Sequence, residues 1–296
     1  MRAMALIVVA LLLPVSPAWA QADELTVYAS VVDKNDAPVA GLSASDFVVR
    51  ENDVSREVLR ASQATAPLQI ALLVDTSQAI DDHLLDIRNA LQAFFKQMGG
   101  KHEIALIGFG ERPTTLVDLT RDAARLQKGI GTVYARQGSG TYLLDAIVET
   151  ADAFERRKAA RPHIIVFAAR GPEFSERHHQ TVVEALQESG ATLHTLMLNR
   201  PGIGLNSREE QELQQAVAEG TRMSGGRRED LLTSMALTER LQSVGNELEH
   251  QYQVIYARPR TLIPPKTLEV SVKKPDVTVR APRWPAQTRE SPPARR

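Results

Sequence analysis

The stretch QIALLVDTSQAID, Gln69 to Asp81, decides the fold of this chain. An apolar run ends on Asp75, two hydroxyl residues follow, and a helical pattern begins a few residues later. Strand-length apolar runs, separated by amphipathic helical patterns, occur at Leu68–Val74, Glu103–Phe109, His163–Ala169 and Ala191–Leu198. Nearly continuous apolar strands that alternate with helices are typical of a parallel sheet covered on both faces. We therefore predict an α/β fold with a doubly wound, mostly parallel sheet.

Further segments complete this domain. The short run Thr114–Val117 closely follows a strand and predicts an antiparallel edge, and helical patterns cover Ser207–Met223 and Met235–His250. The pair His178-His179 is expected at a helix start, where adjacent side chains diverge and do not form a zinc pair. The polar stretch GGRRED, residues 225–230, is interpreted as a loop.

Both chain ends show the period-two pattern of β-strands, in ELTVYASVVD and DFVVREN early and in QYQVIYARP and KTLEVSVKK late. Each set is too small to bury its own apolar face, so we expect the ends to pair into one small β module. The predicted organisation is a β segment at 21–64, an α/β domain at 65–249, a second β segment at 250–284 and a disordered tail at 285–296.

Residues 1–20 have the features of a secretory signal: an early Arg2, a short apolar run, a proline and the ending Ala18-x-Ala20. The apolar run is shorter than a membrane-spanning helix requires. We expect cleavage before Gln21, no membrane anchor, and a periplasmic or secreted product. The chain has no cysteine, which excludes disulfides and thiolate chemistry, and its formal net charge of −1 argues against nucleic acid as a partner.

The turn DTSQA and the later GSGTYLLDAI resemble the von Willebrand factor type A domain and its metal ion-dependent adhesion site. The flanking PVAGLSASDFVVREN, SGGR and QYQVIYARP look like the bacterial VWFA-related domain proteins. The resemblance implies an adhesion or scaffold module without enzymatic activity. It also implies metal ligands at Asp75, Ser77 and Thr141.

Two departures from the family pattern indicate a degenerate metal site. Ala79 lacks the third hydroxyl of the turn, and Arg170 stands where the family has an aspartate. Magnesium requires near-octahedral oxygen coordination, which a guanidinium opposes. We expect Arg170 to pair with Asp75 in place of a cation, although Glu173 could supply an acid if the loop were shifted.

The sequence thus favours an exported protein that binds an unidentified protein partner without metal, through loops at the carboxyl ends of the strands. Binding-surface candidates are Gln78, Ser139, Arg170 and Glu173. Two alternatives stay open: a cation-dependent adhesin with a working Mg or Mn site, and an exported hydrolase. The hydrolase lacks support because no Gly-x-Ser-x-Gly elbow surrounds a serine at a strand-to-helix turn.

Overall fold

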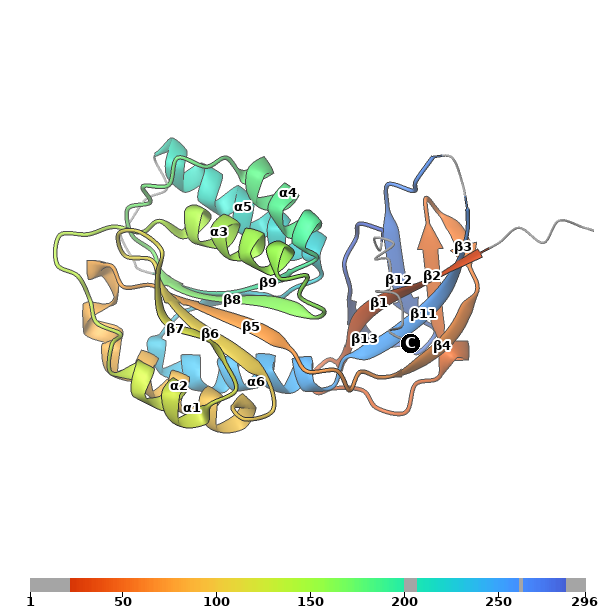
Figure 1. Ribbon diagram of the computed structural model, residues 1–296, viewed down its shortest axis with the longest axis horizontal. Helices are drawn as coiled ribbons and strands as arrows, with labels where there is room; N and C mark the ends of the chain where they lie inside the picture. Colours follow the sequence, from red (N-terminus) through yellow and green to blue (C-terminus); the bar gives the residue numbers. More distant parts are fainter. Residues whose placement is uncertain (1–21, 200–206, 261–262, 286–296) are drawn as a thin grey trace, which may run out of the picture.

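The computed structural model describes residues 22–199, 207–260 and 263–285. An α/β domain with a central sheet occupies one end of the molecule, and a β module occupies the other (Figure 1). The predicted signal sequence at 1–20 and the tail from residue 286 lie outside the described residues. Within the described ranges, no helix is long and apolar enough to cross a membrane.

The central sheet has six strands in the order β10-β9-β8-β5-β6-β7, all parallel except the edge strand β7. Its strands are β5 (Gln69–Val74), β6 (Glu103–Gly108), β7 (Thr114–Thr120), β8 (Pro162–Ala169), β9 (Thr192–Leu198) and β10 (Arg228–Leu231). Because β5 pairs with β6 on one side and β8 on the other, the strand order reverses at β5. Ligand sites of open α/β sheets are found at the carboxyl end of such a reversal.

Helices cover both faces of this sheet, which confirms the predicted fold class (Figure 1). One layer contains α1 (Leu84–Met98), α2 (Ala123–Ile130) and α6 (Leu237–Glu249), and the other contains α3 (Leu143–Arg156), α4 (His179–Ser189) and α5 (Arg208–Ser224). Alternate residues of β5 and β8 enter two separate apolar cores, one beneath each layer. Burial on both faces explains why these strands read as continuous apolar runs.

The β module is built from both ends of the chain, as the alternating segments predict. One sheet has the order β13-β1-β11-β4 and a second has the order β12-β2-β3. Its strands are β1 (Ala22–Asp33), β2 (Phe47–Glu51), β3 (Val54–Arg56), β4 (Val58–Gln63), β11 (Tyr252–Pro259), β12 (Leu268–Val272) and β13 (Val277–Arg280). Apolar side chains of the early strands and the late strands share one core. Neither end could bury this surface alone.

Four charged side chains join the β module to the α/β domain. Asp36 and Arg280 belong to the module, and Arg227 and Glu247 belong to the domain. Arg227 lies 3.0 Å from Asp36 and 3.7 Å from Glu247, while Arg280 lies 3.3 Å and 2.9 Å from the same two carboxylates. Each cation therefore contacts one acid from each part. Arg227 and Glu247 are buried, so this ring of alternating charges fixes how the two parts are oriented.

One sequence interpretation is wrong. The stretch expected to be a loop at 225–230 contains the start of β10, a sixth strand that pairs in parallel with β9. Its sequence, Arg-Glu-Asp-Leu, has no apolar pattern because β10 is an edge strand whose charged side chains form ion pairs: Glu229 contacts Arg227 and Arg240, and Asp230 contacts Arg228. Other strand boundaries differ from the expected ones by a few residues at most.

The buried carboxylate of Glu51 makes the β module sensitive to acid. It accepts hydrogen bonds from Arg258 Nε at 2.8 Å, Tyr256 Oη at 2.8 Å and Arg56 Nε at 2.9 Å. Burial alone would raise the pKa of Glu51, but these donors outweigh burial and lower it. A lowered folded-state pKa contributes stability above the ordinary value of 4.5, and this contribution is lost as the pH falls through the folded-state pKa.

We predict that Glu51→Gln lowers the free energy of unfolding at pH 7 by about 3 kcal/mol, because the two half-buried guanidinium groups of Arg56 and Arg258 lose their buried anion. Below about pH 4.5, the stability of the variant should also fall less than that of the wild type. Chemical denaturation at a series of pH values measures both effects. Glu269→Gln, on the exposed side of β12, is the matched control and should behave as wild type. Equal pH profiles for wild type and Glu51→Gln would contradict the assignment.

Candidate functional site

The turn after β5 lies at the carboxyl end of the central sheet, where the strand order reverses. Asp75 begins this turn and is fully buried. Its Oδ1 accepts a hydrogen bond from Ser77 N at 2.7 Å, and its Oδ2 accepts one from Ala169 N at 3.0 Å. The carboxylate therefore holds its own turn and the end of β8 together. Hydrogen bonds from backbone N–H groups are the usual compensation for a buried carboxylate.

The hydroxyl groups of the turn also serve the backbone. Ser77 Oγ accepts from Ala79 N at 3.2 Å and caps the short helix η2 (Gln78–His83). Thr76 Oγ1 accepts from Gly110 N at 2.8 Å, which draws the loop after β6 against the turn. A Cβ at Gly110 would lie 2.3 Å from the Thr76 carbonyl, so only glycine fits there. The resulting turn is rigid.

Thr141 and Glu173 form a second cluster at the same end of the sheet. The Thr141 hydroxyl donates to Glu173 Oε2 at 2.7 Å, and the backbones of the two residues form a parallel bridge. Ser175 N donates to Glu173 Oε1 at 3.1 Å, and Leu143 N approaches both carboxylate oxygens at 3.2 and 3.3 Å. Burial raises the pKa of Glu173, although hydrogen bonds from Ser175, Thr141 and Leu143 oppose the shift.

The structure corrects two expectations for the loop after β8. Glu173 is buried and is not a binding-surface residue. Arg170 does not pair with Asp75: its guanidinium lies 3.9 Å from Asp230 on β10. The physical reason is the backbone, because Arg170 N donates to Leu198 O of β9 at 3.0 Å and the chain leaves β8 on that side of the sheet. Asp75, held by backbone N–H groups, does not need the guanidinium.

The oxygen donors that a divalent cation would use are limited at this turn. The side chain at Ala79 supplies no oxygen, and a Cβ built on Gly171 would lie 3.3 Å from the Ala79 methyl, which places apolar surface beside the turn. Glu173 is committed to Thr141 and to backbone donors. Among the residues that the structure describes, no group of three or more histidine, cysteine or acidic side chains could hold a metal. Magnesium takes octahedral oxygen coordination, to which Asp75, Ser77 and Thr141 are the side chains of this end that match the family's ligands.

Two of the predicted surface residues do lie at this end. Gln78 is exposed, and its Oε1 accepts from Gly138 N at 3.0 Å. Ser139 is half-buried, and its hydroxyl donates to Arg136 O at 2.8 Å. Arg136 N in turn donates to Thr76 O at 2.9 Å. The segment before α3 is therefore bound to the turn after β5, and the two form one surface.

Sequence reasoning missed the apolar part of this surface. Seven large apolar side chains are strongly exposed within the described part of the chain, and five of them lie on loops or helix starts at the carboxyl end of the sheet. We call these five the carboxyl-end residues: Leu85, Tyr134, Phe174, Leu232 and Met235. Leu232 is 89% exposed and Met235 78%. Exposure of a single apolar residue cannot be read from a sequence pattern, because apolar side chains occur on protein surfaces as well as in cores.

Internal hydrogen bonds hold these exposed side chains on ordered backbone. Ser234 Oγ, between Leu232 and Met235 in their loop, donates to Asp86 Oδ2 at 2.5 Å and lies 3.1 Å from His83 Nδ1. This contact joins the loop after β10 to the start of α1, where Leu85 lies. The ring of Phe174 packs against that of Tyr142, with centroids 6.0 Å apart and planes tilted by 49°. The five side chains are thus presented by a fixed scaffold.

Comparisons with known proteins agree with this architecture. Residues 70–171 match the family model of the von Willebrand factor type A domain. Proximal thread matrix protein 1 from the mussel byssus has a similar structure, with a TM-score of 0.52 and 17% identity, covering 68% of this chain and 50% of that chain. A von Willebrand factor type A structure from Catenulispora acidiphila gives a TM-score of 0.48 at 12% identity, covering 88% and 74%. BatB from Bacteroides thetaiotaomicron gives 0.47 at 15% identity, covering 62% and 100%. No curated protein matches the sequence.

We predict that Glu173→Ala lowers the free energy of unfolding by about 2 kcal/mol, because the Thr141 hydroxyl and two backbone N–H groups lose their acceptor inside the protein. Glu176→Ala, three residues later and exposed, is the control and should change stability by less than about 0.5 kcal/mol. Urea denaturation of the three proteins gives the comparison. Equal stabilities would show that Glu173 does not organise this loop.

Proposed function

We propose that this chain, which contains a von Willebrand factor type A domain, binds a protein partner through the carboxyl-end residues and has no enzymatic role. The observation that carries the proposal is the position of the exposed apolar side chains. Five of the seven strongly exposed ones lie at the end of the sheet where α/β domains bind ligands. Protein-binding surfaces combine such apolar and aromatic side chains with a polar rim.

The rim of this surface supplies hydrogen-bonding and charged groups. Gln78 and Ser139 lie beside the turn after β5, and Arg136 contacts both Glu111 at 2.8 Å and the ring of Tyr134 at 5.4 Å. The internal hydrogen bonds of the turn reduce the conformational entropy that a partner must remove on binding. Exposed apolar side chains on a rigid scaffold, with polar groups between them, suit a folded protein as the partner.

We propose further that binding does not depend on a cation. Three observations support this: Ala79 supplies no oxygen, Glu173 is buried, and Arg170, which stands at the family's acidic position, lies beside Asp230 of β10. The alternative is a cation-dependent adhesin, and a metal titration distinguishes the two.

Hydrolysis has less support. His83, Ser234 and Asp86 lie together, but the histidine and the carboxylate both contact the same hydroxyl. In a Ser-His-Asp triad the histidine stands between the other two groups.

The test of the interaction compares two sets of substitutions. Leu232→Ser/Met235→Ser and Phe174→Ser should reduce recovery of the partner in crosslinking and affinity capture from the native source at least tenfold. Val54→Ser, on β3 of the β module, changes another exposed apolar side chain and is the control that should leave recovery unchanged. Quantitative mass spectrometry measures the recovered proteins. A partner lost with Val54→Ser but retained by the carboxyl-end variants would disprove the proposed surface.

For the metal, we predict that wild-type protein shows no rise in melting temperature with magnesium or manganese, since a ligand stabilises only by binding to the native state. Ala79→Ser/Arg170→Asp, which places oxygen donors at both altered family positions, should gain such a rise. Arg170→Ala alone should cost less than about 1 kcal/mol, because its ion pair with Asp230 is partly exposed. Isothermal titration and thermal melts of the three proteins check this, and tight binding by wild type would establish the adhesin alternative.

A further inference from the structure

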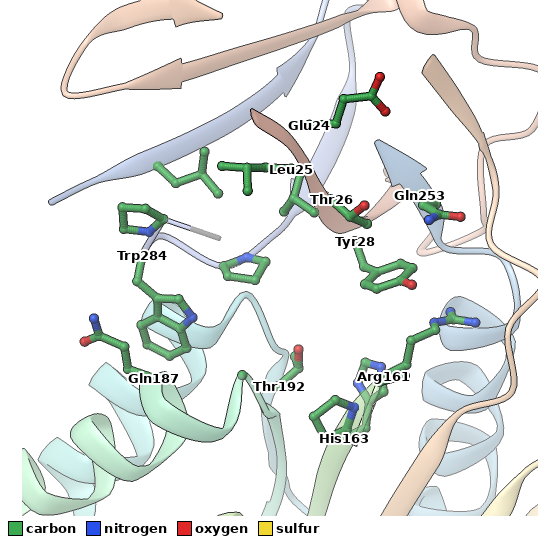
Figure 2. Close-up of a pocket in the computed structure, with 17 residues that line it drawn as sticks. Glu24, Leu25, Thr26, Tyr28, Arg161, His163, Gln187, Thr192, Gln253 and Trp284 are labelled. Carbon is green, nitrogen blue, oxygen red and sulfur yellow. The ribbon is translucent and has the colours of Figure 1, made fainter. Parts of the chain in front are cut away.

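A cavity of about 390 Å³ lies between the β module and the amino-terminal end of the central sheet, opposite the carboxyl-end residues. Its floor is formed by the starts of β8 and β9 and by the end of α4, and β1 passes over it (Figure 2). The volume is within the range of about 300–1,000 Å³ that is usual for ligand pockets. Five consecutive residues of β1, Glu24 to Tyr28, line the cavity. Since neighbouring side chains of a strand point to opposite faces, such a run means that the backbone edge of β1 faces the cavity.

This edge of β1 has no strand partner among the described residues. On one side β11 pairs with Ala22–Ala29 of β1. On the other side β13 pairs only with Ser30–Asp33. The segment Glu24–Tyr28 is therefore an open strand edge. Open edges carry unpaired N–H and C=O groups that can accept another strand.

The hydrogen bonds of β11 identify which groups of β1 point into the cavity. Gln251 O accepts from Ala64 N and Ala257 N donates to Glu57 O, so the odd-numbered residues of β11 face β4. The even-numbered residues of β11 then face β1, where they pair with Ala29, Val27 and Leu25. In an antiparallel ladder the intervening residues point their backbone groups the other way. The N–H and C=O groups of Glu24, Thr26 and Tyr28 consequently face the cavity.

The walls of the cavity are aromatic at two sides and cationic at the floor. Trp284 lies at one side, and Tyr28 lies over Arg161 at the other, with the guanidinium carbon 4.9 Å from the ring centroid (Figure 2). Arg161 is 3% exposed and donates to Ala66 O and to Gln251 Oε1, but none of the ion pairs in the described structure involves it. Its buried Nε and the buried Nδ1 of His163 have no hydrogen-bond partner. Neutral oxygens, including Leu248 O at 3.4 Å, and the Tyr28 ring surround this buried cation, and without an anionic partner it favours an anionic ligand.

We propose that this cavity binds an extended peptide segment of a partner protein, which adds as a strand to the open edge of β1 and carries a carboxylate side chain toward Arg161. Strand addition supplies affinity through backbone hydrogen bonds, and pockets for alternate side chains supply selectivity. Glu24, Thr26 and Tyr28 provide the backbone groups, Trp284 provides an apolar wall, and Arg161 selects charge. This site is separate from the proposed carboxyl-end surface, so neither proposal depends on the other.

The experiment uses the full chain with Trp19→Phe, which leaves Trp284 as the only tryptophan. The probes are three blocked pentapeptides, acetyl-Thr-Val-Asp-Val-Thr-amide and its versions with Asn or Lys at the centre, whose β-branched residues favour an extended backbone. We expect saturable changes in Trp284 emission, with affinity in the order Asp above Asn above Lys. Calorimetry with the same peptides confirms binding independently of fluorescence.

The decisive variant removes one donor from the edge. Thr26→Pro deletes an N–H that points away from β11, a position where an edge strand tolerates proline, and should weaken the Asp peptide about tenfold or more. Thr26→Val keeps the N–H and should bind as wild type. If Thr26→Pro fails to fold, an Asp peptide methylated on alternate backbone nitrogens should show the same loss on the unaltered edge. Absence of saturable binding by all three peptides, or equal binding to the Pro and Val variants, would overturn the proposal.

Discussion

The buried carboxylate of Asp75 is the interaction on which the carboxyl end of the central sheet depends. A fully buried charge is costly unless hydrogen bonds compensate it, and here the N–H groups of Ser77 and Ala169 do so at 2.7 and 3.0 Å. One of these donors belongs to the turn after β5 and the other to the end of β8. The same side chain therefore shapes the turn and joins two neighbouring strands. Thr76 then binds Gly110, and Arg136 binds Thr76, so three loops are ordered around one acid.

The residues at the family's ligand positions have a structural role in this protein. Asp75, Ser77 and Thr141 all serve as hydrogen-bonding partners within the protein: two accept from backbone N–H groups and the third donates to Glu173. Each of the three side chains therefore contributes to the stability of the loops. The presence of Asp75, Ser77 and Thr141 is thus compatible with the proposed binding surface, in which Leu232, Met235 and the other carboxyl-end residues supply the binding energy.

The sequence predicted the layers of the fold well, because strands buried on both faces must be apolar throughout and β5 and β8 are. It failed at β10, where an edge strand carries charges that pair with Arg227 and Arg228 rather than an apolar pattern. It failed also for Arg170. The direction of a side chain after a strand depends on which neighbouring strand the backbone follows. Here the hydrogen bond from Arg170 N to Leu198 O directs the Arg170 side chain toward Asp230. The exposed state of Leu232 and the interior position of Glu173 follow from loop packing, which periodicity does not encode.

The junction between the two parts of the molecule explains why an open strand edge can persist at β1. A free edge invites aggregation unless something restricts access to it. Here the ring of Asp36, Arg227, Glu247 and Arg280 holds the β module against the amino-terminal end of the sheet, and this places the edge inside a cavity instead of on a flat surface. A single extended chain fits such a space more readily than the edge of another folded sheet does. The ion pairs that orient the two parts therefore also determine what the edge can bind.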